Sequence, residues 1–186
     1  VCSSDLGGIS LRTNVGRISA PTVGAEWFIT RSDVALHVFA EQAQFTSASQ
    51  LTIAGMAASR LVSIADMRRV GISGVILSPG PGAFKPYLEV GYSLNLIGTA
   101  TDSVRSYAST AQRDSVNSAI NNAKSSGKLF ASLGATAIVG KWAPFGQVTI
   151  MPTKGSGTSL VNGDGVAYLF SVGLRYNFGR SSEKIF

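Results

Sequence analysis

Hydrophobic and polar residues alternate with a period of two along most of this chain. The pattern is clearest in 165–178, GVAYLFSVGLRYNF, where the even positions are bulky and apolar and the odd positions are mostly small or polar. Successive side chains of a β-strand point to opposite faces of the sheet. A period of two over this length therefore predicts a strand with two chemically different faces and excludes a helix.

The same alternation predicts seven further strands. A weak strand at 6–13 precedes a hairpin with arms at 22–30 and 34–41, which are joined by the polar turn 31–33. The remaining four strands lie near 69–77, 87–99, 129–139 and 147–150. The chain thus carries eight predicted strands.

The links between these strands alternate in length. From the second strand onward, short links (31–33, 78–84, 141–144) alternate with long ones (46–63, 101–128, 152–164). Inside the second long link, apolar residues at helical spacing predict a helix over 114–126, with Gly127 as its stop. Alternation of short and long links is typical of outer-membrane up-and-down barrels, which have short periplasmic turns and long extracellular loops. With an even number of strands, both termini are expected on the periplasmic side.

The predicted fold class is all-β. We expect an up-and-down antiparallel transmembrane β-barrel of about eight strands, with a short helix in one long loop. The barrel domain is assigned to 7–178 and a C-terminal tail to 179–186. The first six residues, VCSSDL, look like translated sequencing adapter, so we expect 1–6 to be non-native or disordered.

Composition indicates which face of the barrel meets lipid. Only 14% of residues are Asp, Glu, Lys or Arg, against ~25% in typical soluble domains. If the strand positions of the polar parity, meaning the alternate set with small or polar side chains, faced outward, they would give a water-facing surface with few charges. The bulky parity, turned inward, would overfill an eight-stranded barrel. We therefore expect the apolar parity to face lipid, with aromatic residues such as Trp142 and Tyr176 in interfacial girdles. No run of 18 or more apolar residues, as a transmembrane helix would need, occurs in the chain.

The charged residues of the strands all lie on the polar parity. They are three of each sign: Arg12, Glu26, Glu41, Arg69, Glu89 and Arg175. Because buried charges must be paired, we predict that these residues and His37 form a polar network in the barrel interior. Within it, Glu41 and Arg69 lie on consecutive strands at similar distances from their short turns, which predicts an ion pair or a shared network between them.

His37, the only histidine, is the residue that invites a catalytic interpretation. Small outer-membrane barrels that modify lipids hold a His and a Ser close together near one rim, whereas the local sequence here, LHVFAE, contains no serine. We therefore predict no catalytic residue. A metal site would need a second His or a Cys cluster at ligand spacing, so neither a metal nor another cofactor is expected. Cys2 alone permits no intramolecular disulfide.

The strand that ends at Phe178 resembles the closing strand of bacterial outer-membrane β-barrels. The match is a glycine followed by alternating apolar and aromatic residues: Gly173, Leu174, Tyr176 and Phe178. The resemblance to the small porin-like barrels of Gram-negative bacteria implies a non-enzymatic, monomeric envelope protein whose last strand is a signal for the barrel-assembly machinery. Since side chains fill the interior of an eight-stranded barrel, we expect a structural or surface-display role. A narrow channel or small-ligand transport barrel, and a lipid-active enzyme, are the alternatives.

The net charge of +6 is compatible with anionic partners. No nucleic-acid-binding motif and no basic run interleaved with aromatic residues is present, so nucleic acid is not expected. Because the long loops carry most of the excess positive charge, we expect contacts with outer-membrane lipids and lipopolysaccharide. The candidate residues for these contacts are Arg105, Arg113, Lys124 and Lys128. Simple solvation of the loops is the alternative explanation of these charges.

Overall fold

Nine strands and one helix make up the part of the chain that the structure describes. The computed structural model describes residues 3–15, 20–51, 60–79, 82–103, 106–152 and 165–178. In chain order the elements are β1 (Ser3–Val15), β2 (Ala20–Arg31), β3 (Val34–Leu51), β4 (Arg60–Leu77), β5 (Phe84–Ile97), β6 (Ala100–Asp102), α1 (Thr110–Ala123), β7 (Ser125–Ala137), β8 (Trp142–Pro152) and β9 (Val166–Asn177).

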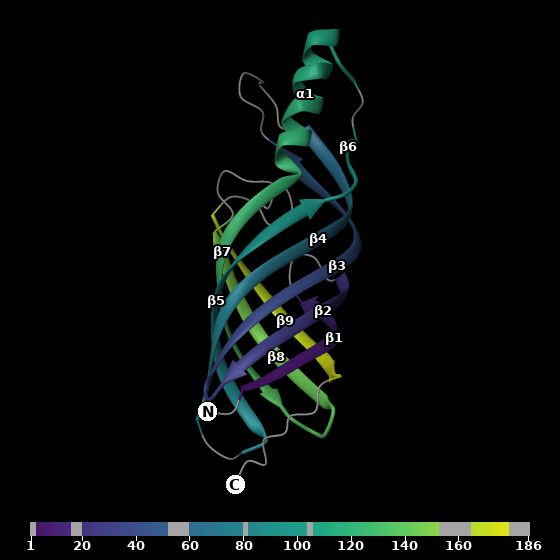
Figure 1. Ribbon diagram of the computed structural model, residues 1–186. Helices are drawn as coiled ribbons and strands as arrows, with labels where there is room; N and C mark the ends of the chain where they lie inside the picture. Colours follow the sequence, from purple (N-terminus) through teal and green to yellow (C-terminus); the bar gives the residue numbers. More distant parts are fainter. Residues whose placement is uncertain are drawn as a thin grey trace.

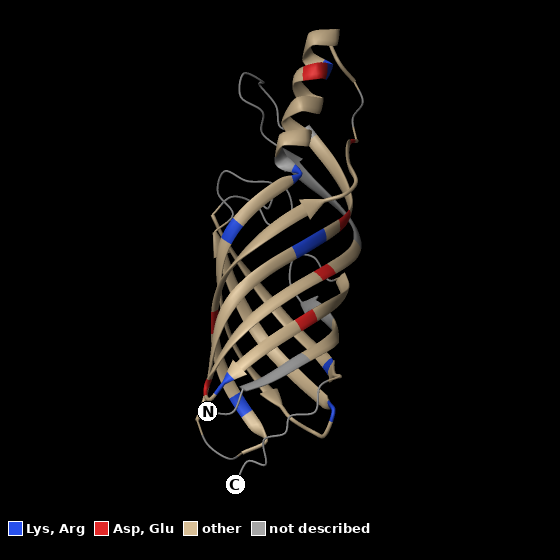
Figure 2. Ribbon diagram, in the orientation of Figure 1, with Lys and Arg blue, Asp and Glu red and all other residues tan. Residues whose placement is uncertain are grey.

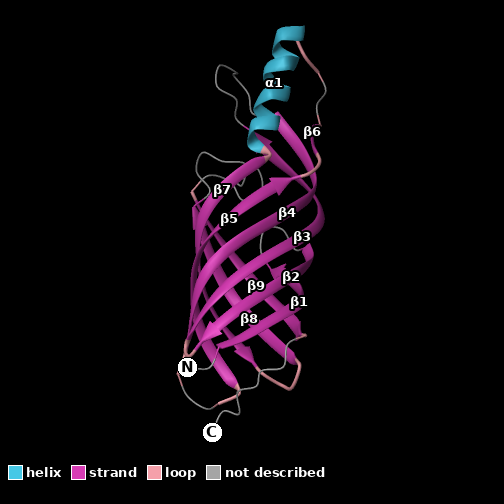
Figure 3. Ribbon diagram, viewed as in Figure 1, coloured by secondary structure: helices cyan, strands magenta, loops and turns pink. Residues whose placement is uncertain are grey.

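The strands form one antiparallel sheet that closes on itself (Figures 1 and 3). The order of neighbours is β3-β2-β1-β9-β8-β7-β5-β4, and the pairing of β3 with β4 completes the ring. The three-residue strand β6 takes no part in the ring and pairs with the first part of β4. Leaving β6 aside, the described chain is an eight-stranded up-and-down barrel, which confirms the predicted fold class.

The first strand begins and the last strand ends at the end of the barrel that carries the short turns, hereafter the short-turn end. Ser3 is paired with Arg31, beside the turn between β2 and β3, and the Phe178 N–H donates to the carbonyl oxygen of Gly7 at 2.7 Å. At the opposite end, α1 rises above the barrel (Figure 1). Residues 3–6 therefore belong to the sheet, within the segment 1–6 that the sequence led us to expect to be non-native or disordered. The predicted tail, 179–186, lies outside the described residues.

The two faces of the barrel wall differ in chemistry as the alternation predicts. The outward side chains are apolar and open, with Val23 at 62% and Val90 at 55% exposure. The inward side chains of the same strands are polar and covered, with Glu26 at 7% and Ser93 at 0%. An apolar outer wall around a polar interior is the arrangement of a barrel in lipid. Within the described ranges, no helix has the length and apolar character needed to cross a membrane.

Aromatic rings gather on the outer wall at the short-turn end. The Tyr176 ring packs edge-on against Trp142, with centroids 4.8 Å apart, and against Phe178, with centroids 5.3 Å apart. The Lys141 ammonium lies 6.0 Å from the centre of the Tyr176 ring. Rings with one polar edge are favoured where hydrocarbon gives way to water. This cluster fits the interfacial girdle that the sequence predicts.

Two strands are much longer than a membrane requires. β3 and β4 have 18 residues each, which is roughly 60 Å at ~3.3 Å per residue and roughly 45 Å of height at a tilt of about 40°, against an apolar band of ~25 Å. The outward apolar series of β4 ends at Val70, and the next outward side chain, Arg68, is charged and exposed. The far parts of β3 and β4 therefore project beyond the band.

The projecting parts of β3 and β4, together with β6 and α1, form what we call the projecting module. It has an apolar core separate from the barrel interior, made by Val62, Ile64, Ala100, Val116 and Ile120 together with Ile97 from the end of β5. The helix is capped at its start by Ser109, whose hydroxyl accepts a hydrogen bond from the Gln112 N–H at 3.2 Å. The predicted helix is thus present, and its apolar face is the one that packs.

The expected long loop at 46–63 is largely strand. β3 continues to Leu51 and β4 starts at Arg60, so only 52–59, which lie outside the described residues, separate them. The alternation of apolar and polar residues is interrupted in this segment, because the pairing of β3 with β4 shifts between Gln44 and Ser47. In β4 the buried positions are odd at Arg69 and beyond but even at Ile64 and Val62. The extra residue of this bulge lies in β3, between Gln44 and Ser47, so the change in β4 comes instead from α1, whose Val116 and Ile120 cover Val62 and Ile64.

Two further boundaries differ from the prediction. The helix spans Thr110–Ala123 instead of 114–126, and Gly127 lies in β7 opposite Leu94. A Cβ atom at Gly127 would overlap the Tyr92 hydroxyl, so this glycine leaves room for a cross-strand side chain and is not a helix stop. The short link at 141–144 is also tighter than expected, since β8 already begins at Trp142.

The apolar band of the outer wall, hereafter the belt, predicts that the cost in stability of a charged side chain there depends on its depth in the membrane. Val90 pairs with Gly74 within the belt, so Val90→Arg should lower the free energy of unfolding in lipid vesicles by ~2 to 4 kcal/mol. Leu61→Arg is the matched control, because Leu61 is an exposed apolar residue of the projecting module and should tolerate the change within ~1 kcal/mol. Equal costs at the two sites, measured by urea titration, would contradict the placement of the belt.

Candidate functional site

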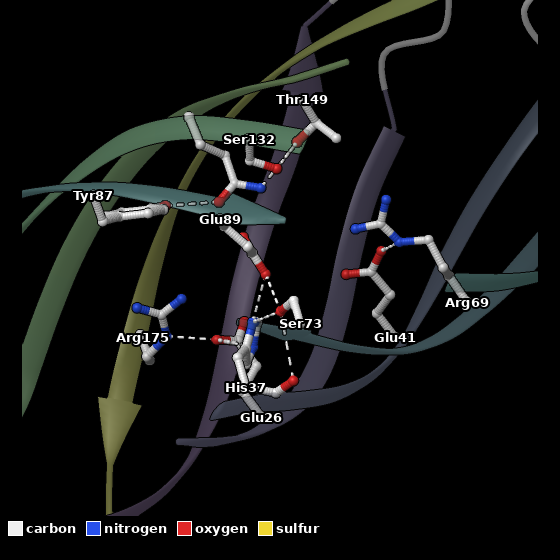
Figure 4. Close-up of polar contacts among 11 residues, drawn as sticks. Glu26, His37, Glu41, Arg69, Ser73, Tyr87, Glu89, Ser132, Thr149 and Arg175 are labelled. Atoms are coloured by element: carbon white, nitrogen blue, oxygen red, sulfur yellow. Dashed lines mark hydrogen bonds and ion pairs between the residues drawn. The ribbon is translucent and has the colours of Figure 1, made fainter. Parts of the chain in front are cut away.

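The most highly organised polar site lies inside the barrel and is centred on His37 (Figure 4). His37 Nδ1 is 2.8 Å from Glu89 Oε1, and His37 Nε2 is 3.5 Å from Glu26 Oε2. The three side chains are 5 to 8% exposed. The imidazole thus sits between two buried carboxylates, one from β5 and one from β2.

Two more side chains complete this site. Arg175 Nε lies 2.5 Å from Glu26 Oε2, and the Ser73 hydroxyl donates to Glu89 Oε1 at 2.5 Å. We call Glu26, His37, Ser73, Glu89 and Arg175 the interior network. Its members come from β2, β3, β4, β5 and β9, so it links five strands around the ring. Two of its contacts, His37 with Glu89 and Arg175 with Glu26, join strands that are not neighbours in the sheet.

Aromatic rings fill the space around the network. The Phe28 ring stacks on the His37 imidazole, with centroids 4.0 Å apart and planes 5° apart. The Arg175 guanidinium carbon lies 4.7 Å from the ring centres of both Phe28 and Phe145. A guanidinium over ring faces retains favourable electrostatics while excluding water. The short-turn half of the barrel is therefore packed with side chains.

A second charged layer lies farther from the short-turn end. Glu41 and Arg69 are directly opposite in the β3–β4 ladder, and Arg69 Nε is 2.5 Å from Glu41 Oε1. The Arg69 guanidinium carbon lies 5.0 Å from the centre of the Phe39 ring and 5.8 Å from that of Phe130. Both charged side chains are at most 10% exposed. The structure thus brings these two residues together as an ion pair held between rings.

Of the seven residues predicted for the interior, six have described side chains, and all six lie inside the barrel. The seventh, Arg12, is opposite Thr22, a buried inward-facing residue, but its side chain lies outside the described residues. Among the described residues the carboxylates of Glu26, Glu41 and Glu89 face the guanidiniums of Arg69 and Arg175. Among these described residues three carboxylates thus face two guanidiniums, and a positive charge at the position of His37 would balance the third carboxylate.

Sequence reasoning missed Ser73, which the fold brings beside the histidine. His37 and Ser73 pair across the β3–β4 ladder, and Ser73 Oγ is 3.3 Å from His37 Nδ1. Only the strand register could have revealed this, because the long hairpin left the pairing of β3 with β4 undetermined. The local sequence around His37, LHVFAE, contains no serine, but the fold places Ser73 beside it. The lack of a nearby serine therefore does not distinguish this chain from lipid-modifying barrels.

The hydrogen bonds of Ser73 and His37 differ from those of a simple serine–histidine pair. A nucleophilic serine must give its proton to a neighbouring base, whereas the Ser73 hydroxyl bonds more closely to Glu89, and His37 Nδ1 also bonds to Glu89. Ser73 is only 3% exposed, so its side chain is enclosed within the barrel. Nor do three or more His, Cys, Asp or Glu side chains within the described ranges form a group that could hold a metal ion.

The structure also places the residues proposed for lipopolysaccharide contact. Arg113 lies in α1, Lys124 is the C-cap residue of that helix, Lys128 lies in β7 opposite Ser93, and Arg105 lies outside the described residues. The Arg113 guanidinium is 3.3 Å from the Asp114 carboxylate in an exposed pair. The helix stands above the barrel (Figures 1 and 2) instead of lying along a plane of head groups, and Val116 and Ile120 pack into the projecting module. The three cations with described positions thus lie at the start of α1, at its C-terminal cap and in β7.

The residues of the predicted assembly signal lie in and just after the closing strand. Gly173 and Leu174 belong to β9, where they pair with Arg12 and Leu11 of β1. Tyr176 and Phe178 belong to the aromatic cluster on the outer wall described above. The motif thus lies at the seam where the two ends of the chain close the ring.

Comparison with known proteins identifies the fold. No family model and no curated protein matches the chain. Among solved structures, the N-terminal β-barrel domain of Pseudomonas aeruginosa OprF aligns over 95% of this chain and 100% of its own, with 10% identity and a TM-score of 0.52. Neisserial surface protein A (NspA) aligns over 95% and 97%, with 13% identity and a TM-score of 0.50. The chain has the fold of the small outer-membrane β-barrels.

The Glu41–Arg69 pair yields a stability prediction. Because removal of one partner leaves a buried charge, Glu41→Gln and Arg69→Gln should each lower the free energy of unfolding by ~3 to 5 kcal/mol. The double variant should cost clearly less than the sum of the two single variants, since no charge is then left alone. Unfolding titrations of the four refolded proteins in one detergent complete this double-mutant cycle. Additive losses would show that the two side chains are not coupled.

Proposed function

We propose that the protein is an integral outer-membrane barrel that does not conduct solutes and that anchors a rigid module on the cell surface. The observation that carries the proposal is the interior network, which links five strands around the ring with charged and aromatic side chains. Eight strands enclose only enough space for side chains. A barrel packed in this way fits a structural or surface-display role better than a channel.

The two ends of the barrel support an orientation. In outer-membrane barrels the short turns are periplasmic and the long connections extracellular. On this basis we place both termini in the periplasm and the projecting module outside the cell. The seam formed by β1 and β9 is then the region where the barrel-assembly machinery would act, and the protein is proposed to work as a monomer.

Lipopolysaccharide contact is a secondary part of this proposal. Arg113 of α1 and Lys124, its C-cap residue, are separated by 11 positions, or roughly 16 Å along the helix axis at ~1.5 Å per residue. Such a spread favours weak, salt-sensitive attraction over a defined binding pocket. Each basic group near an anionic surface contributes ~1 kcal/mol, and salt screens this contribution.

Conductance separates the sealed barrel from a narrow channel. In planar bilayers the wild-type protein should show no stable open state. A Phe28→Ala/His37→Ala variant, which removes the stacked rings from the interior, should conduct. Trp27→Ala is the matched control, because it removes a large ring from the outer face of the same strand and should stay silent. A wild-type conductance as large as that of the double variant would refute the sealed interior.

Charge substitution tests the lipopolysaccharide contact. Changing Arg113, Lys124 and Lys128 together to Gln should weaken binding of the refolded barrel to lipopolysaccharide at low salt and have little effect at high salt. The matched control changes three cations at the short-turn end, Arg31, Lys85 and Lys141, to Gln, which alters the net charge equally. Equal binding by the two variants would mean that the cations near α1 serve only for solvation.

A further inference from the structure

A second candidate site lies on the projecting module, far from the interior network. A cavity of about 450 Å³ opens between α1 and the β6 segment. This volume is within the range of ~300 to 1,000 Å³ that is usual for small-molecule sites. The lining residues are Ala100, Thr101, Asp102, Tyr107, Asn117, Ile120 and Asn121. We call this cavity the α1–β6 groove.

The polar side of the groove offers both donors and acceptors. Asn117 and Asn121 are four positions apart on α1, so their carboxamides lie on the same face of the helix, and both are exposed. Asp102 of β6 contributes a carboxylate, and Thr101 contributes an exposed hydroxyl. Each carboxamide has two N–H donors and an oxygen acceptor, while the carboxylate accepts only. The set is suited to a ligand with several neighbouring hydroxyl groups.

The remaining lining is apolar. Tyr107 and Ile120 belong to or pack against the core of the projecting module, and the methyl group of Ala100 lies beside them. A ring whose edge carries hydroxyls and whose faces carry C–H groups would meet polar partners on one side and carbon on the other. That combination is the chemistry of a pyranose sugar.

The groove rests on rigid elements. β6 is bonded to β4 through the pairs of Ala100 with Ile64 and Asp102 with Val62, and the Ser103 N–H donates to the Leu61 carbonyl oxygen at 2.8 Å. Asp102 and Tyr107 also interact with other groups of the protein, so a ligand would meet side chains that are already positioned. A preorganised site loses less conformational freedom on binding.

Charge narrows the class of ligand. The lining contains one carboxylate and neither a lysine nor an arginine, so phosphate or sulfate would be repelled. Four of its seven residues, Thr101, Asp102, Asn117 and Asn121, are polar, which disfavours a bare acyl chain. From the groove geometry and this donor set, we infer that the α1–β6 groove binds a neutral hexopyranose unit of a saccharide. The inference does not depend on whether the barrel conducts.

Titration of the full refolded chain with free sugars tests the inference. In alkylphosphocholine micelles, which carry no sugar, saturation-transfer NMR should detect glucose, galactose or N-acetylglucosamine on the protein, and inorganic phosphate should not compete. Asn117→Ala/Asn121→Ala should weaken binding about tenfold, because several hydrogen bonds are lost while alanine preserves the helix. The matched control, Ser118→Ala/Asn122→Ala, is rotated by about 100° on the same helix and should leave binding unchanged.

A second arm distinguishes the source of the sugar. Lipopolysaccharide with its full saccharide and a deep-rough form that lacks most of it are compared on the wild type and on the Asn117→Ala/Asn121→Ala variant. Loss confined to the full-length form identifies the saccharide of lipopolysaccharide as the ligand, whereas binding of free sugars alone indicates a soluble or foreign glycan. No sugar signal on the wild type, equal binding by the two asparagine-based variants, or competition by phosphate would overturn the inference.

Discussion

Closure of the backbone hydrogen-bond ladder is the constraint on which the rest of this structure depends. An N–H or C=O group in hydrocarbon has no water to bond with, so each strand must have a partner on both sides. The pairing of β1 with β9 and of β3 with β4 supplies the last two partners. Once the ring is closed, the outer wall can be apolar over its whole circumference, and the polar parity is left to fill the inside.

The interior network is a consequence of that closure. Charges taken out of water are costly unless they are paired, and a pair of buried ions adds little net stability. What Glu26, His37, Glu89 and Arg175 provide is contact between strands that the ladder does not join: β2 lies two strands from β9, and β3 lies two strands from β5. The network therefore ties the ring across its short-turn half, where its side chains lie inside the barrel.

β3 and β4 lie in two different environments along their length: lipid in the belt, and water and protein beyond it. In the belt, outward residues of β3 and β4 such as Val38 and Ile72 are exposed and apolar. Beyond the register shift at Gln44 and Ser47, β6 pairs with β4, and the buried residues Val62 and Ile64 pack with Val116 of α1. Outside the lipid, apolar surface has to be covered by protein, and the projecting module supplies that cover. Its rigid core also gives the α1–β6 groove a fixed shape.

Local pattern was sufficient for the architecture of the wall. Alternation in segments such as 165–178 determined which side chains face out and which face in, because the direction of a side chain depends only on its position within its own strand. The number of ring strands, the placement of Glu26, Glu41 and Arg69 inside, and the existence of the helix follow from the same local reasoning. The distribution of charged and bulky side chains between the two sets of alternating positions was enough to predict which face of the wall meets lipid.

Only the tertiary structure decided what depends on register between strands. The contact of Ser73 with His37, the continuation of β3 and β4 through the segment expected to be a loop, and the role of Gly127 beneath Tyr92 all involve residues of different strands. A bulge shifts the pairing by one residue without leaving a clear mark in composition. The α1–β6 groove likewise joins a helix and a strand whose sequences show no shared pattern. Side-chain facing is a property of one strand and can be read from the sequence, whereas contact across the ring is a property of pairs and requires the fold.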